Sequence, residues 1–450
     1  MADPEKRDLV SIEDLSQDEI VELFQHADEF RDNLSAWSEL CRGTIMATLF
    51  FEPSTRTRLS FESAMLRLGG GVISAADDKT TSRSKGESLA DTVRVVGGSY
   101  ADILVVRHPE DGAARVAARY ASVPVINGGD GSHEHPTQTL CDLYTLWKEK
   151  GRLEGLEVVL CGDLRYSRTI HSFCYALARF KANIVTLPYP GFEMPDYVLR
   201  RLQRDFGVKA AVASVADLPG IAGSSNAAAY LTASGPHQLA LFTKLTPHEV
   251  DRIDAIYMTR AQLERHAGEE TKNYPRLSAK TLDTAATKDA RVMHPLPRID
   301  EIDYAVDSDP RSVYFRQAEL GVPMRMALMA FLLGRIQLRS RSPEEASTAS
   351  GIDPRSGLRC RNERCISNGE GVRYLNRDFK LRNRSRNPTF DCAYCEREVA
   401  VHFLAHRGQG WYRPLTAAVL REVPKDDQVW LESAAQAESL GFRAADATEV

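Results

Sequence analysis

The chain has 450 residues, 43% of them hydrophobic, which is enough for two or three domains with cores of their own. Its formal net charge of −5 excludes a general attraction to nucleic acid or to anionic membranes, so any site for an anion must be local. No segment approaches the roughly 20 apolar residues of a membrane span, and the N-terminal residues lack the apolar core of a secretory signal. We therefore expect a cytoplasmic protein that binds neither nucleic acid nor membrane.

Short apolar runs alternate with helical patterns along most of the chain. A capping box at Ser16 and Glu19 begins the first predicted helix, and further helical patterns cover 112–121, 135–151 and 169–180. The runs that are typical of strands lie at 44–51, 102–108, 123–129, 156–163, 183–187, 255–260 and 291–297. Strands that alternate with helices indicate βαβ units, so we predict an α/β fold with parallel sheets.

The spacing of these runs predicts two α/β domains, residues 1–150 and 151–338. Within the second domain, residues 216–250 are rich in Ala, Ser and Gly and fit no simple element, so we interpret them as an insertion. Three segments follow, namely a polar linker, a cysteine-containing domain and an acidic tail to which we assign no role: 339–357, 358–407 and 408–450.

A run of hydroxyls and arginines stands where a helix is predicted to begin, Ser54-Thr55-Arg56-Thr57-Arg58. One interpretation is ordinary capping by Ser or Thr, with the arginines solvated. Arginine in a first turn works against the helix dipole, however, unless an anion binds there. Free N–H groups, hydroxyls and guanidinium groups together suit a phosphate, which is the second interpretation.

Polar residues also close or follow several of the predicted strands. They are Arg107, His135, Gln138, Arg168, Arg260 and Gln262, together with the turn at Pro295 and Leu296. No glycine-rich cofactor fingerprint, paired-carboxylate site or nucleophilic serine elbow accompanies them. This set of side chains suits the binding of several anionic groups and a polarised carbonyl without covalent catalysis or an organic cofactor.

With these motifs, residues 8–338 resemble the catalytic chain of the aspartate carbamoyltransferase family. The motifs that carry the resemblance are S-T-R-T-R at 54–58, H-P-T-Q at 135–138, Y-M-T-R-A-Q at 257–262 and H-P-L-P-R at 294–298. The related ornithine carbamoyltransferases typically carry Cys where Pro295 stands, and a Ser-Met-Gly motif that does not occur here. The resemblance implies two parallel α/β domains of the carbamoyltransferase fold, with the active site between them.

The resemblance also implies roles for individual residues. It assigns carbamoyl phosphate to Ser54, Thr55, Arg56, Thr57, Arg107, His135, Gln138, Pro295 and Leu296. It assigns aspartate to Ser82, Lys85, Arg168, Arg260 and Gln262, and direct participation in catalysis to Arg56, Thr57, Lys85, Arg107 and His135. Ser82 and Lys85 would reach the site of a neighbouring subunit in a trimer, whereas the residue types alone are typical of a solvated loop.

The implied activity is transfer of a carbamoyl group from carbamoyl phosphate to L-aspartate, the committed step of pyrimidine biosynthesis. Two alternatives stay open at this point. The acceptor could be another amino acid, since residues 216–250 precede the strand that carries Arg260. The chain could also be an inactive homologue that serves as a scaffold.

Four of the eight cysteines form two close pairs near the C-terminus, Cys360 with Cys365 and Cys392 with Cys395. This spacing predicts a structural, tetrahedral zinc site, and a nucleic-acid-binding zinc ribbon is the alternative. The segment resembles the zinc domain of the family's regulatory chain, which implies docking on a catalytic chain in a trimer or a dimer of trimers. The family's nucleotide-binding domain precedes that zinc domain, but only the linker stands there here, so we do not expect nucleotide control by the family's usual route.

Overall fold

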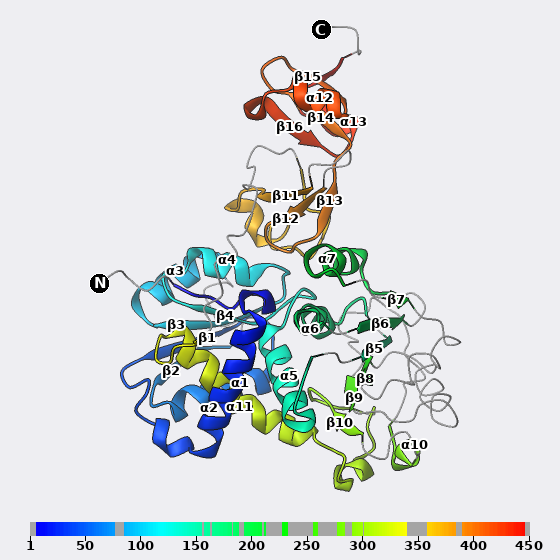
Figure 1. Ribbon diagram of the computed structural model, residues 1–450. Helices are drawn as coiled ribbons and strands as arrows, with labels where there is room; N and C mark the ends of the chain where they lie inside the picture. The colour runs from blue at the N-terminus through cyan, green and yellow to red at the C-terminus, as the bar shows by residue number, and fades with distance from the viewer. Residues whose placement is uncertain are drawn as a thin grey trace. The chain divides into compact units, whose positions relative to one another are not determined.

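The structure is a computed structural model. It describes residues 6–76, 85–154, 157–162, 164–181, 183–188, 193–208, 211–212, 227–232, 255–259, 277–283, 290–299, 301–339, 358–383 and 389–445. The chain divides into two compact units (Figure 1): the first comprises Met1–His108 and Ala117–Arg341, the second Pro109–Val116 and Ser342–Val450. Among the described helices none is both long and apolar enough to cross a membrane.

The first unit contains a parallel sheet built from the N-terminal part of the chain. Its described strands are β1 (Ile45–Phe50), β2 (Gly71–Ala75), β3 (Ile103–His108) and β4 (Val125–Asp130), in the order β2-β1-β3-β4. The accompanying helices are α1 (Gln17–Asp32), α2 (Thr55–Arg67), α3 (Leu89–Ser99), α5 (Pro136–Lys150) and the second half of α4 (Ala113–Tyr120), whose first half belongs to the second unit. Because β1, β3 and β4 are parallel neighbours, the segments that follow them meet at one edge of the sheet.

A second parallel sheet of the first unit follows in sequence. Its described strands are β5 (Glu157–Gly162), β6 (Asn183–Pro188), β7 (Ala211–Val212), β8 (Ala227–Thr232), β9 (Ala255–Thr259) and β10 (Arg291–Met293), in the order β10-β9-β8-β5-β6-β7. Its helices are α6 (Arg168–Arg179), α7 (Asp196–Phe206), α10 (Ala279–Leu282) and α11 (Tyr314–Leu332). The predicted α/β class with parallel sheets is confirmed.

One expectation for the second sheet needs correction. β8 lies inside 216–250, the range interpreted as an insertion, and pairs with both β5 and β9 in the interior of the sheet. Its sequence contains three consecutive alanines, which have low β propensity. The strand therefore forms because it pairs with two neighbouring strands, and the local sequence pattern does not predict it. The rest of 216–250 lies outside the described residues.

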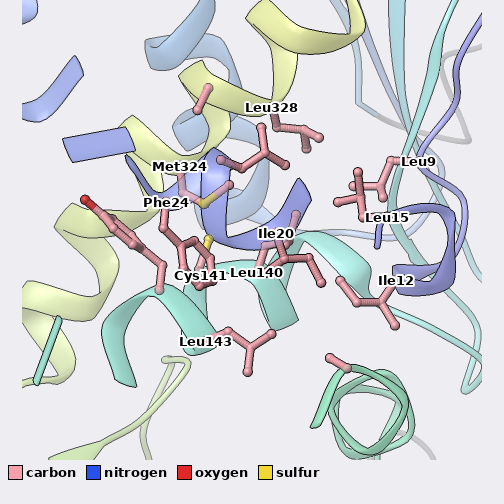
Figure 2. Close-up of a cluster of buried hydrophobic side chains, with 14 of the residues drawn as sticks. Leu9, Ile12, Leu15, Ile20, Phe24, Leu140, Cys141, Leu143, Met324 and Leu328 are labelled. Carbon is pink, nitrogen blue, oxygen red and sulfur yellow. The ribbon is translucent and has the colours of Figure 1, made fainter. Parts of the chain in front are cut away.

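A core of helices joins the two halves of the first unit. Ile20 and Phe24 of α1, Leu140 of α5, and Met324 and Leu328 of α11 are buried in one apolar cluster (Figure 2). α11 comes after the last strand of the second sheet, yet it packs on α1, α2 and α5 beside the first sheet. This packing holds α5 and α11 against each other, so that Gln317 of α11 reaches Asp142 of α5.

The second unit consists of the C-terminal part of the chain and the short segment 109–116. After the short helix η8 (Glu370–Arg373), a first sheet consists of the antiparallel strands β11 (Phe379–Asn383), β12 (Thr389–Cys392) and β13 (Glu398–Ala400). The strands of a second sheet are β14 (Phe403–His406), β15 (Trp411–Pro414), β16 (Gln428–Leu431) and β17 (Arg443–Ala444). The helices α12 (Ala417–Glu422), η9 (Lys425–Asp427) and α13 (Ala434–Ser439) lie between these strands in the sequence.

The sequence pattern predicts an acidic tail over residues 408–450, but their described part is folded. β14 to β17 form a sheet in the order β16-β14-β15-β17 over a small core that includes Tyr412, Val429 and Leu431. An ion pair between Arg413 and Glu422 joins β15 to α12. The strands have two to four residues each, which is too short for an apolar periodicity to stand out in the sequence.

Candidate active site

The hydroxyl- and arginine-rich run begins α2, directly after β1. Ser54 is the N-cap residue, and its side chain makes no capping hydrogen bond to the helix. Thr55 and Arg56 are exposed, whereas Thr57 is buried. The interpretation as ordinary side-chain capping by Ser54 is therefore not what the structure shows. The first N–H groups of α2 remain available for an anion.

Arg107, at the end of β3, lies beside the residue that begins α5. Its Nη1 is 2.9 Å from the Gly128 carbonyl oxygen and 3.5 Å from Nε2 of His135. A guanidinium group can only donate, so Nε2 of His135 is the acceptor in this contact. The backbone N–H of His135 donates to Oγ of Ser172 on α6 at 2.9 Å, which links the helix start to the second sheet's helices.

Arg168, at the start of α6, joins the same cluster through a carboxylate. Glu52 lies 3.0 Å from Nη1 of Arg168 and 3.3 Å from Nη2 of Arg107, so one carboxylate bridges two guanidinium groups. Nη1 of Arg168 also donates to the carbonyl oxygen of Gly131 at 2.7 Å. Both arginines are buried, and with one carboxylate between them the cluster keeps a positive excess that suits an anionic ligand.

Two residues of this cluster were missed by sequence reasoning. Glu52 stands two positions before Ser54, where a lone carboxylate beside arginines gives no motif of its own. Gly129 has φ +114°, and a Cβ built on it would lie 2.8 Å from Nη1 of Arg107 and 3.2 Å from Cζ of Arg168. Only glycine therefore leaves room for both guanidinium groups at this point.

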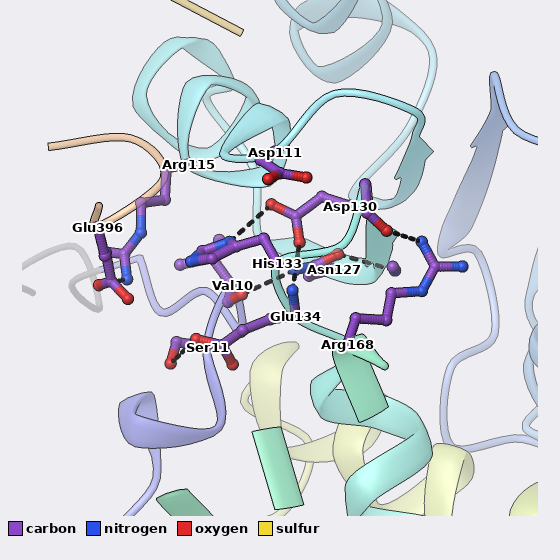
Figure 3. Close-up of polar contacts among 12 residues, drawn as sticks. Val10, Ser11, Asp111, Arg115, Asn127, Asp130, His133, Glu134, Arg168 and Glu396 are labelled. Carbon is purple, nitrogen blue, oxygen red and sulfur yellow. Dashed lines mark hydrogen bonds and ion pairs between the residues drawn. The ribbon is translucent and has the colours of Figure 1, made fainter. Parts of the chain in front are cut away.

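A buried polar network shapes the segment between β4 and His135 (Figure 3). Asn127 donates through Nδ2 to the Val10 carbonyl oxygen at 2.9 Å and to Oδ1 of Asp130 at 3.0 Å. Nδ1 of His133 lies 3.1 Å from Oδ2 of Asp130, and the backbone N–H of Glu134 donates to Oδ1 at 3.1 Å. Asp130 thus holds the segment in one conformation.

The Glu134 carboxylate ties this segment to other parts of the first unit. It accepts hydrogen bonds from Oγ of Ser11 at 2.7 Å, the N–H of Ile12 at 3.1 Å and Oγ of Ser172 at 3.3 Å. Burial raises the pKa of Glu134 above its ordinary value. Ser172 is the residue whose Oγ also receives the His135 N–H, so this network holds the start of α5 in place.

The Pro295–Leu296 turn follows β10 and is held by a buried pair. Nδ1 of His294 accepts the N–H of Leu296 at 2.8 Å, and Nε2 lies 2.8 Å from Oε1 of Glu301. Since Nδ1 is the acceptor, Nε2 carries the proton and donates to Glu301. Burial lowers the pKa of His294, which agrees with a neutral ring. Leu296 has φ +50°, a strained conformation for a residue with a side chain.

The other predicted site residues are placed as follows. Gln138 lies on the first turn of α5 and is partly buried, and Lys85 is exposed just before α3. Ser82, Arg260 and Gln262 lie outside the described residues. Direct contacts and the shared Glu52 carboxylate therefore bring together Arg107, His135 and Arg168.

The four C-terminal cysteines form a separate metal-binding centre in the second unit. All four are buried, and their sulfur atoms lie within 4.8 Å of one another. Sγ of Cys360 is 3.4 Å from that of Cys395, and Sγ of Cys365 is 3.8 Å from that of Cys392. Four sulfurs at about 2.3 Å from a central zinc ion in a tetrahedron would be about 3.8 Å apart, so the thiols fit that metal.

Segment 109–116 is part of the fold around this centre. The N–H of Asp111 donates to the Arg364 carbonyl oxygen at 2.8 Å, and the N–H of Ile366 donates to the Asp111 carbonyl oxygen at 3.0 Å. Nδ2 of Asn362 donates to Oδ2 of Asp111 at 2.8 Å. An ion pair between Arg115 and Glu396 adds a further link. These contacts flank Cys365, one of the cysteines of the centre.

Three family models match the chain. Residues 7–148 match the carbamoyl-P binding domain and residues 154–332 the Asp/Orn binding domain of aspartate/ornithine carbamoyltransferase. Residues 351–402 match the metal binding domain of the aspartate carbamoyltransferase regulatory chain.

Individual relatives agree with these matches. The aspartate carbamoyltransferase catalytic subunit of Clostridium kluyveri is 43% identical over 334 residues, which cover 73% of this chain and 98% of the relative. That of Thermoplasma acidophilum is also 43% identical, with the same coverage.

Solved structures resemble the chain over the same part of its length. The catalytic subunit of M. jannaschii aspartate transcarbamoylase has a TM-score of 0.58 at 39% identity and covers 73% of this chain and 98% of its own. The Trypanosoma cruzi enzyme in complex with carbamoyl phosphate and aspartate has a TM-score of 0.57 at 34% identity, covering 72% of this chain and 95% of its own.

Proposed function

The chain belongs to the aspartate carbamoyltransferase family, and we propose that it transfers the carbamoyl group of carbamoyl phosphate to the amine of L-aspartate, releasing phosphate. Its product is N-carbamoyl-L-aspartate, which places the reaction at the committed step of pyrimidine biosynthesis. The observation that carries the proposal is the pair Arg107 and Arg168 around Glu52, with His135 beside Arg107, at the sheet edge where α2 begins.

The proposed mechanism assigns the phosphate of carbamoyl phosphate to the start of α2. Ser54, Thr55, Arg56 and Thr57 offer hydroxyl, guanidinium and N–H donors there, because Ser54 does not cap the helix through its side chain. In the reaction the neutral amine of aspartate attacks the carbonyl carbon, and negative charge appears on the departing phosphate. Donors that meet this charge lower the barrier most in the transition state.

Arg107, Thr57 and His135 would surround the carbonyl oxygen. Charge grows on this oxygen during the attack, and one well-placed donor at such a position contributes roughly 2.7–4 kcal/mol. Since the contact with Arg107 makes Nε2 of His135 an acceptor, His135 as an oxyanion donor would have to turn or take up a proton when the substrate binds. The departing phosphate can take the amine proton, so no further general base is required.

Arg168 would bind a carboxylate of aspartate, together with Arg260 and Gln262. Glu52 already holds the guanidinium of Arg168 in position, and a guanidinium has five N–H donors, so it can bind a second carboxylate while it keeps the first. Ser82 and Lys85 would complete the site from a neighbouring subunit. A homotrimer, or a dimer of trimers, is part of this proposal.

The metal of the second unit is proposed to be structural zinc. Four thiolate ligands leave no coordination position for a substrate, so the metal would supply folding stability and no chemistry at the active site. The four cysteines of the centre are free thiols, which agrees with a metal site in a reducing cytoplasm.

A steady-state assay with carbamoyl phosphate tests the function directly. We expect turnover with L-aspartate to exceed turnover with L-ornithine and with other amino acids, measured as carbamoylated product under saturating donor. Faster turnover of ornithine would overturn the assigned acceptor. Absence of turnover with every amino acid, in protein that binds carbamoyl phosphate, would instead favour the inactive scaffold.

A further inference from the structure

A relay of hydrogen bonds joins two segments that the proposed function assigns to the carbamoyl group. Nε2 of Gln138 donates to Oδ1 of Asp142 at 2.7 Å, and Nε2 of Gln317 donates to the same oxygen at 2.8 Å. Oε1 of Gln317 accepts the backbone N–H of His294 at 2.9 Å. Asp142, Gln317 and His294 are buried, so the relay connects α5, α11 and the end of β10 in the interior of the first unit.

The relay determines which end of each amide faces which neighbour. Two N–H groups converge on Oδ1 of Asp142, so this oxygen is an acceptor. Two hydrogen bonds fix the orientation of the Gln317 amide, because its oxygen accepts the His294 N–H and its nitrogen donates to Asp142. The Gln138 amide must likewise turn its NH₂ group to Asp142, which turns its carbonyl oxygen the other way.

The same relay orients a second acceptor. The Leu296 N–H points at Nδ1 of His294, whose backbone is held by Gln317. The Pro295–Leu296 peptide is trans and planar, so the Pro295 carbonyl points away from His294. Gln138 Oε1 and Pro295 O are thus two acceptors set by one buried network, which matches the two N–H donors of a carbamoyl group.

We infer that Asp142 is a positioning residue that makes the Gln138 side chain an acceptor and thereby selects a carbamoyl donor over acyl phosphates with a methyl group in place of NH₂. The inference rests on the proposed function, because it needs carbamoyl phosphate as the donor. Without Asp142 the Gln138 amide loses the bond that orients it and can present either end. A methyl group offers no donor, so its recognition does not depend on this orientation.

Asp142→Ala tests the inference, because alanine removes the oxygen that accepts both N–H groups, whereas asparagine would keep such an acceptor. The dissociation constant of carbamoyl phosphate, measured by calorimetry, should rise about tenfold, the effect of one lost hydrogen bond of about 1.4 kcal/mol. The inhibition constant of acetyl phosphate should change by less than about threefold, because acetyl phosphate shares only the phosphate and the carbonyl. A merely structural role would weaken both ligands equally, and that result would overturn the inference.

A double-mutant cycle with Gln138→Ala shows whether Asp142 acts through Gln138. Asp142→Ala should add almost nothing in the Gln138→Ala background, whereas additive losses would refute the assignment. Thr145→Val is the matched control. Thr145 is a buried polar residue one turn further along α5, and its hydroxyl donates to the Cys141 carbonyl oxygen and to no residue of the relay. It should leave both ligands unaffected.

Two further measurements separate the possible failures. If Asp142→Ala does not fold, Asp142→Glu keeps a carboxylate but moves its oxygens one methylene away from their place beside the Gln138 amide, and it should show the same selective loss of carbamoyl phosphate binding. Loss of binding for both ligands in Asp142→Glu would count against the inference. Failure of the unmutated enzyme to carbamoylate aspartate would overturn the proposed function instead, whatever the variants show.

Discussion

Replacing Gly129 by alanine should displace the two arginines of the candidate active site without unfolding the protein. The new Cβ would lie 2.8 Å from Nη1 of Arg107 and 3.2 Å from Cζ of Arg168, so both guanidinium groups must shift. The backbone at φ +114° adds about 1–3 kcal/mol of strain to the folded state. A displacement of about 1 Å at reacting groups lowers a rate by about 100-fold, which corresponds to about 2.7 kcal/mol in the barrier.

The chain offers a matched control for the strain alone. Gly151, at the end of α5, has φ +73°, and no atom lies within 4 Å of the point that a Cβ would occupy, so Gly151→Ala strains the backbone but moves no side chain. Gly151→Ala should lower the melting temperature and leave kcat/KM almost unchanged. Gly129→Ala should lower kcat/KM about 100-fold. Carbamoyl-transfer kinetics and thermal melting measure both, and a Gly129→Ala enzyme as active as the Gly151→Ala enzyme would refute the reasoning.

Three further perturbations test the remaining assignments. Arg56→Ala should lower kcat by orders of magnitude with the fold intact, because its charge meets the leaving phosphate in the transition state; near-normal turnover at saturating substrate would remove Arg56 from the mechanism. Lys85→Ala should be nearly inactive alone but regain activity when its subunits are mixed with those of Arg56→Ala, and no recovery after verified mixing would show that each site belongs to one chain. Chelation or Cys392→Ser should unfold residues 358–405 and shift the particle to smaller oligomers that keep substantial turnover. Circular dichroism measures the unfolding, light scattering the mass and the transfer assay the turnover; an unchanged mass would rule out a role in assembly.

Sequence patterns predicted the parts of the site that depend on residues in local motifs. Arg107 and His135 end or follow strands whose apolar runs are easy to recognise, and parallel pairing then brings them together. Glu52 and Gly129 could not be predicted in this way. The importance of Glu52 comes from two arginines more than 50 residues away in the chain, and that of Gly129 from the space those arginines need.

The same distinction holds for the fold. Amphipathic helices such as α1 carry their own signal, with a capping box and buried residues at helical spacing. β8 has no such signal, because alanines form a strand here only between two partners that come from distant parts of the sequence. The sheet of β14 to β17 was missed because its strands are short and its core is small.

The bond between Asp111 and Asn362 spans 251 positions of the chain, and this separation bears on how the protein is made. During synthesis the segment 109–116 leaves the ribosome long before the four cysteines, so this part of the fold can be completed only after Cys395 has been made. A fragment that starts after residue 342 would lack this piece of its own fold. Because the segment and the centre belong to one polypeptide, they are always produced in equal numbers, and each finds the other at the high local concentration of a tether and not by diffusion between separate chains.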